Sequence, residues 1–156
     1  MIVVSVGTNE ARFDRLLEWL SDLELEDDLV VQHGPSTVRP PGSRCVPYLP
    51  YEDLVELVRE SRAFVTHAGV GSIMMALFSG RRPVVVPRLK RFGEAVDDHQ
   101  VSLARRLQAE GLVTHVESVG ALERALAHGS HEVARMGGAT ALQHELHEYL
   151  AGLPRL

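Results

Sequence analysis

The sequence has little cysteine, few aromatic residues and no long apolar run. The single Cys45 excludes an internal disulfide and fits a reducing compartment such as the cytosol. No apolar stretch approaches the ~20 residues of a membrane-spanning helix. A net charge of −5 and an aromatic content of 5% argue against nucleic-acid binding. Met1 leads directly into a strand-like segment, so we expect no signal peptide.

Strand-like apolar segments alternate with amphipathic helical segments along the chain. This alternation predicts one α/β domain over residues 1–156, with a parallel sheet of about six strands and right-handed crossovers. The uniformly apolar run at 83–87 predicts a central strand. Ligands of such sheets bind at the carboxyl ends of the strands. We expect strands at 2–6, 29–33, 44–46, 63–66, 83–87 and 112–116, and helices at about 11–23, 52–59, 72–79 and 98–110.

A glycine-rich turn follows the strand expected at 63–66. Gly69, Val70, Gly71 and Ser72 lead into a helix, where backbone N–H groups and the helix dipole favour an anion. Another turn, Gly7-Thr8, follows the first strand. Neither is a full dinucleotide fingerprint or a P-loop, so an ordinary tight turn is the alternative for each.

His67 lies directly after the same strand. It is a candidate phosphate donor or general acid–base. The alternative is a packed histidine that bonds to neighbouring backbone.

A second polar segment, 97–100, opens the helix expected at 98–110. His99 and Gln100 are candidate ligand contacts there. The alternative is a capping box, with Asp97 as the N-cap and Gln100 reaching back to it. Between the two segments, 81–91 is a cationic stretch that carries no acid. It attracts a diphosphate, an anionic membrane or an acidic partner, unless it is a solvated loop. Its charged residues are Arg81, Arg82, Arg88, Lys90 and Arg91.

The sequence holds no convincing metal or nucleophile motif. His144 and His147 are three residues apart on an expected helix, but no HExxH pattern surrounds them. Cys45 has no catalytic signature. We therefore expect no metal and no cofactor.

Three segments together resemble a known family. They are VVSVGTNEARFDRL (3–16), VTHAGVGSIMMALFSG (65–80) and PVVVPRLKRFGEAVDDHQVSLARRLQAEGLV (83–113). They are similar to the donor-binding half of family-28 glycosyltransferases. The nearest type is the small subunit of two-part bacterial exopolysaccharide glycosyltransferases, related to the eukaryotic two-subunit N-acetylglucosaminyltransferase.

The resemblance implies a Rossmann-like domain, the C-terminal half of a GT-B glycosyltransferase, that binds a UDP-sugar without a required metal. It implies that Gly7 and Thr8 face the donor and that the turn from His67 to Ser72 lies under the diphosphate. It also places Tyr48 and Leu49 beside the uracil, and Gln100, with His99, near the sugar or phosphates. Met75 departs from the family, because many members carry a ribose-binding glutamate there.

The resemblance also implies an acceptor half on a separate, membrane-associated protein and a lipid-linked glycan acceptor. We therefore expect a cytoplasmic donor-binding catalytic subunit, recruited to the inner face of the membrane by its partner. The alternative is a non-catalytic nucleotide-sugar-binding or regulatory subunit, which Met75 favours. No general base can be assigned. An apolar stripe on the helix expected at 139–153 closes the core or meets a partner or a second copy; it comprises Leu142, Leu146, Tyr149, Leu150 and Leu153.

Overall fold

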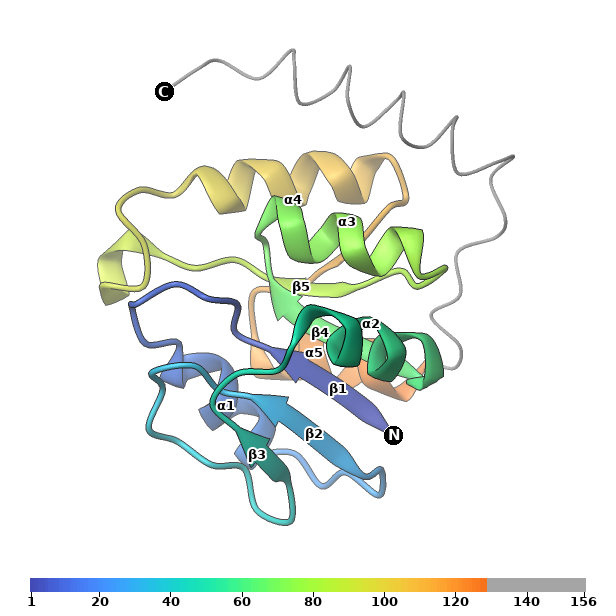
Figure 1. The fold of residues 1–156 in the computed structure, drawn as a ribbon. Helices are drawn as coiled ribbons and strands as arrows, with labels where there is room; N and C mark the ends of the chain where they lie inside the picture. The colour runs from blue at the N-terminus through green and yellow to red at the C-terminus, as the bar shows by residue number, and fades with distance from the viewer. Residues whose placement is uncertain (129–156) are drawn as a thin grey trace.

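The computed structural model describes residues 1–128 as a layered α/β domain around one parallel sheet (Figure 1). The apolar stripe of 142–153 and the histidines at 144 and 147 lie outside these residues. The strands are β1 (Ile2–Ser5), β2 (Leu29–Gln32), β3 (Arg44–Val46), β4 (Ala63–His67), β5 (Val84–Val86) and β6 (Thr114–His115). The helices are α1 (Asp14–Ser21), α2 (Tyr51–Glu60), α3 (Val70–Phe78), α4 (His99–Ala109) and α5 (Val119–Ala127), with a 3-10 turn η1 (Lys90–Phe92).

The sheet is entirely parallel and follows the order β3-β2-β1-β4-β5-β6. This is the strand order of the Rossmann fold, in which the chain reverses its direction of travel at the first strand. Val3 of β1 pairs with Val30 of β2 on one side and with Phe64 of β4 on the other. The six predicted strands are therefore confirmed, together with the parallel sheet.

The strand at 83–87 was expected to be central, and here the prediction was wrong. β5 is an interior strand between β4 and β6, while β1 and β4 occupy the centre. A uniformly apolar run indicates that the strand's side chains are buried on both faces of the sheet, and all interior strands share this property. It carries no information about how many strands lie on each side.

Helices cover both faces of the sheet, which explains the continuous apolar strands. The cluster on one face joins α1 and α5 to β1, β2, β4 and β5, and Leu17, Leu122, Val4 and Val65 are among its buried members. On the other face, Phe64 of β4 packs with residues of α2 and α3, and a further cluster joins α3 and α4 to β5. In the described part of the chain, no helix has the length and apolar character to cross a bilayer.

Candidate functional site: a pocket at the strand-order reversal

A pocket of about 390 Å³ opens at the carboxyl ends of β1 and β4. These two strands are neighbours at the point where the strand order reverses, which is where open α/β sheets bind their ligands. The volume lies within the range of small-molecule sites. The lining residues are Ser5, Gly7, Thr8, Gln32, Leu49, Tyr51, Leu54, His67, Gly71, Ser72 and Met75.

The pocket brings together six of the sequence-predicted site residues. They come from the β1–α1 loop, the loop after β3, the end of β4 and the first turn of α3. The other five predicted residues do not line it. The lining six are Gly7, Thr8, Leu49, His67, Gly71 and Ser72; the others are Tyr48, Gly69, Val70, His99 and Gln100.

Helix α3 begins at the pocket without a side-chain cap. Its N-cap residue is Gly69, which has no hydroxyl or carboxylate to offer the first-turn N–H groups. An α-helix leaves its first N–H groups without intrahelical acceptors. A Cβ added to Gly71 would meet no atom within 4 Å, so the backbone there is open to an incoming group. The first turn of α3 is therefore suited to an anion in the pocket.

The imidazole of His67 is held between two glycines. A Cβ added to Gly7 or to Gly69 would overlap the ring. Gly7 also has a φ of 80°, a conformation that L side chains rarely adopt. These glycines make room for His67, which the sequence alone could not indicate.

His67 is a neutral side chain in this environment. Burial lowers its pKa to about 4, and the positive charge of Arg88 adds to the effect, against a backbone hydrogen bond at Ser5. Thr66 Oγ1 donates to the Ser5 carbonyl at 3.0 Å and lies 3.2 Å from Nδ1 of His67. His67 packs against its neighbours, as the second interpretation expected, and it also lines the pocket, while its role toward a ligand stays a prediction. A pKa of about 4 makes it a weak base at neutral pH.

Two buried polar residues at the pocket, Ser5 and Gln32, were missed in the sequence. Gln32 Nε2 donates to Ser5 Oγ at 3.1 Å, and its Oε1 accepts the backbone N–H of Leu49 at 3.0 Å. Ser5 Oγ accepts the N–H of Gly7 at 3.2 Å. The two side chains therefore fix the loops after β1 and β3. In the sequence, the one indication of their role was that each is a polar residue at the end of an apolar strand.

The remaining predicted site residues lie on the same sheet edge with other contacts. Tyr48 is 52% exposed in the loop after β3. His99 is exposed, and both its backbone N–H and its Nδ1 contact the Asp97 carboxylate, which lowers the pKa of Asp97. Gln100 is 8% exposed, and its Oε1 accepts the backbone N–H of Arg88 at 3.1 Å.

The proposed capping box at 97–100 was wrong. The N-cap of α4 is Asp98, whose carboxylate accepts the N–H of Lys90 at 2.9 Å and makes no cap bond. Gln100 binds Arg88 instead of reaching back to Asp97. Gln100 accepts from the Arg88 backbone, and Asp98 from that of Lys90, because the β5–α4 loop lies against the start of α4.

The cationic stretch at 81–91 is also not a uniformly solvated loop. Arg88 is fully buried, and its side chain donates to backbone carbonyls. Lys90 and Arg91 are exposed in η1. Beside them, Arg15 and Glu94 form a two-pronged ion pair, with Nε–Oε1 at 2.9 Å and Nη2–Oε2 at 2.8 Å.

A second cavity, of about 540 Å³, lies beside α4 and the end of β5. Two of its arginines are already paired, Arg15 with Glu94 and Arg105 with Glu117. None of the predicted site residues lines it. The pocket at the strand-order reversal is therefore the better candidate site.

Met75 is buried in the core on α3, where it packs with Val3 and Phe64, and one side of it reaches the pocket wall. Within residues 1–128, no group of three histidine, cysteine, aspartate or glutamate side chains could hold a metal ion.

Comparison with known proteins fixes the family. Residues 1–146 match the glycosyltransferase family 28 C-terminal domain. The chain belongs to this family. This confirms the predicted family at the level of the glycosyltransferase family 28 C-terminal domain. No curated protein matches the sequence.

Solved glycosyltransferases share the fold. The glycotransferase of kitacinnamycin aligns with a TM-score of 0.62 at 22% identity, over 81% of this chain and 33% of that one. MurG of Acinetobacter baumannii gives 0.56 at 20%, over 81% and 40%. SnogD from Streptomyces nogalater gives 0.54 at 21%, over 78% and 32%. The chain thus spans between about a third and two fifths of these proteins, and its fold is that of the C-terminal half of GT-B enzymes.

Proposed function

We propose that this family-28 domain is the donor-binding catalytic subunit of a two-part glycosyltransferase. It moves a sugar from a UDP-sugar to a lipid-linked acceptor in exopolysaccharide or glycan biosynthesis. The observation that carries the proposal is the pocket between β1 and β4, into which the uncapped first turn of α3 opens. The resemblance of the three sequence segments to the small subunits of such enzymes supports the two-part form.

The diphosphate of the donor binds at the first turn of α3 in this proposal. The backbone at Gly69, Val70, Gly71 and Ser72 stabilises negative charge as the leaving group departs, which is an electrostatic contribution to catalysis. His67 is neutral and contributes the pocket wall rather than a positive charge. Gly7 and Thr8 form the opposite wall.

The uracil lies against the loop after β3. Leu49 lines the pocket, and its backbone N–H is held by Gln32 Oε1. Tyr48 and Tyr51 flank Leu49 in the chain, and their exposed rings are available to stack on a base in this proposal. His99 and Gln100 act at the sugar or phosphates, but Gln100 must do so while its Oε1 holds the Arg88 backbone. Met75 cannot grip the ribose hydroxyls, because a thioether is a weak acceptor. We therefore expect modest affinity for the donor.

The acceptor site belongs to a second polypeptide in this proposal. Transfer needs an oriented acceptor hydroxyl and a donor shielded from water, which one face of a cleft cannot provide. The resemblance of the three sequence segments to the small subunits of two-part enzymes supports an acceptor half on another chain. We therefore assign the acceptor half, with the general base, to a membrane-associated partner that recruits this domain to the cytoplasmic face.

The buried Met75 also favours a second candidate, a non-catalytic sensor or regulatory subunit that binds a nucleotide sugar. Calorimetry with UDP, ADP and GDP tests donor binding. We expect UDP to bind most tightly, and equal affinity for all three, or none at millimolar ligand, would contradict both candidates. A transfer assay with labelled UDP-sugar and a lipid-linked acceptor, with and without the partner, separates them. The enzyme turns over only with its partner, whereas a sensor binds without turnover.

A further inference from the structure

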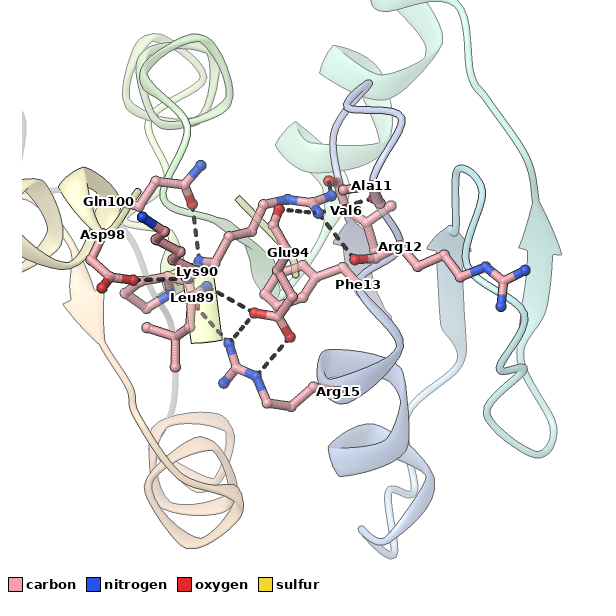
Figure 2. Close-up of polar contacts among 12 residues, drawn as sticks. Val6, Ala11, Arg12, Phe13, Arg15, Leu89, Lys90, Glu94, Asp98 and Gln100 are labelled. Atoms are coloured by element: carbon pink, nitrogen blue, oxygen red, sulfur yellow. Dashed lines mark hydrogen bonds and ion pairs between the residues drawn. The ribbon is translucent and has the colours of Figure 1, made fainter. Parts of the chain in front are cut away.

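Arg88 is the largest fully buried side chain in the described residues, and its guanidinium is surrounded by backbone carbonyls. Nη2 donates to the Val6 carbonyl at 2.7 Å. Nη1 lies within hydrogen-bonding distance of three more: Ala11 at 3.0 Å, Arg12 at 3.3 Å and Glu94 at 3.1 Å. Figure 2 labels the four acceptor residues, which belong to the segment from the end of β1 to α1 and to the β5–α4 loop.

Three of the carbonyls that Arg88 binds lie at the two ends of the β1–α1 loop, which we call the donor loop because it carries Gly7 and Thr8. Val6 immediately precedes Gly7, while Ala11 and Arg12 end the loop before α1. One guanidinium therefore holds both ends of the segment that carries Gly7 and Thr8 into the pocket.

The charge of Arg88 has no carboxylate hydrogen-bonded to it among the described residues. The acceptors of its Nη1 and Nη2 groups are neutral backbone carbonyls, and its Nε has no hydrogen-bond partner. The nearby Glu94 carboxylate is engaged by Arg15 and by the N–H of Leu89. The Phe13 ring lies 4.7 Å from the guanidinium carbon and offers only its π face. An arginine remains protonated in a protein, so a buried, incompletely neutralised cation stands behind the donor loop.

The field of this cation reaches the pocket. After burial, the Arg88 charge is the next largest cause of the low pKa of His67, a pocket-lining residue. A field that disfavours a proton on His67 favours an anion in the same space.

We propose that Arg88 is a positioning residue that clamps the β1–α1 loop and, through its buried charge, holds the diphosphate of the donor without touching it. The inference rests on the proposed donor-binding function. It assigns the preference for a diphosphate partly to a side chain outside the pocket lining. The helix terminus of α3 and the Arg88 charge then act on the same phosphates from two elements of the fold.

The test compares UDP with uridine, which carries the same base and ribose without phosphates. We expect Arg88→Met and Arg88→Gln to weaken UDP binding roughly tenfold while uridine binding changes less than about twofold. Arg88→Lys keeps the charge and loses the forked geometry, so the ratio of the two affinities stays near that of the wild type. Arg105→Met is the matched control, because it removes an exposed guanidinium that pairs with Glu117.

Parallel losses for UDP and uridine in the neutral variants would reduce Arg88 to a structural clamp and overturn the electrostatic part of the proposal. So would a wild-type protein that binds both ligands equally. If the neutral variants do not fold, Arg88→Lys keeps the proposal falsifiable, because a lost ratio in a variant that retains the charge overturns it. A wild-type protein that binds neither ligand contradicts the proposed function itself, which separates the two failures.

Discussion

Gly69 lies against the imidazole of His67 so closely that a single added methyl group would overlap the ring. The backbone of Gly69 has an ordinary φ of −85°, so the requirement for glycine here is steric rather than conformational. The turn after β4 therefore has two distinct glycines. Gly69 makes room for His67, and Gly71 leaves the pocket open.

The contact between Gly69 and His67 predicts a coupled pair of substitutions. Gly69→Ala should lower the free energy of unfolding by about 1–3 kcal/mol, because the imidazole must leave its site. In a His67→Ala background the same change should cost much less, since the obstacle is gone. Urea unfolding of the two single variants and the double variant measures the coupling. Strictly additive effects would show that the ring moves aside freely.

Gly71 should behave in the opposite way. A valine side chain at this position enters open space at the mouth of the pocket, so Gly71→Val should abolish UDP binding and leave the fold intact. Circular dichroism and a calorimetric titration on the same sample measure both properties. Normal UDP binding by the folded variant would rule out the proposed phosphate position.

The ion pair between Arg15 and Glu94 should contribute strongly to stability. Glu94 is 4% exposed, and Glu94→Gln leaves the largely buried Arg15 guanidinium without its counter-charge. We expect a loss of about 3 kcal/mol in urea unfolding. The control is Glu117→Gln, which breaks the exposed pair with Arg105 and should cost less than about 1 kcal/mol. Similar costs for the two variants would contradict the burial argument.

The depressed pKa of His67 predicts that the domain loses stability in weak acid. The unfolded chain takes up a proton at His67 near pH 6.5, whereas the folded chain does so only near pH 4. The unfolded state therefore binds more protons between these values, and the free energy of unfolding falls as the pH drops through this window. The full contribution is about 3 kcal/mol.

Urea unfolding at several pH values, with wild type and His67→Gln, checks this expectation. The variant should lose stability less steeply between pH 6.5 and pH 4. Burial also lowers the pKa of His115, which leaves a smaller residual slope in both proteins. Parallel curves would show that His67 titrates normally in the folded state.

Local patterns were enough to predict the elements of the fold but not their neighbours. Strands buried on both faces, such as β1 and β5, are continuous apolar runs that the sequence displays directly. Their order in the sheet depends on crossovers that no local pattern encodes. For this reason β5 was expected at the centre, which β1 and β4 occupy.

At the site, the sequence indicated the glycine turns and the histidine but not the residues that support them. Gln32 and Ser5 end buried strands, where a polar residue resembles an ordinary strand terminus. Arg88 stands in a cationic stretch of the sequence, and arginine is rarely buried in full. Its acceptors Val6 and Ala11 are 82 and 77 residues away in the chain, so only the folded structure reveals the clamp.

The span between Arg88 and Val6 also bears on the order of folding. Their hydrogen bond joins the end of the first strand to the end of the fifth, so the loop entropy of 82 residues must be overcome before it forms. A chain emerging from the ribosome can pair β1 with β2 early, but its donor loop stays unclamped until β5 has docked against β4. We therefore expect nucleotide affinity to arise late in folding, once β5 has joined the sheet beside β4.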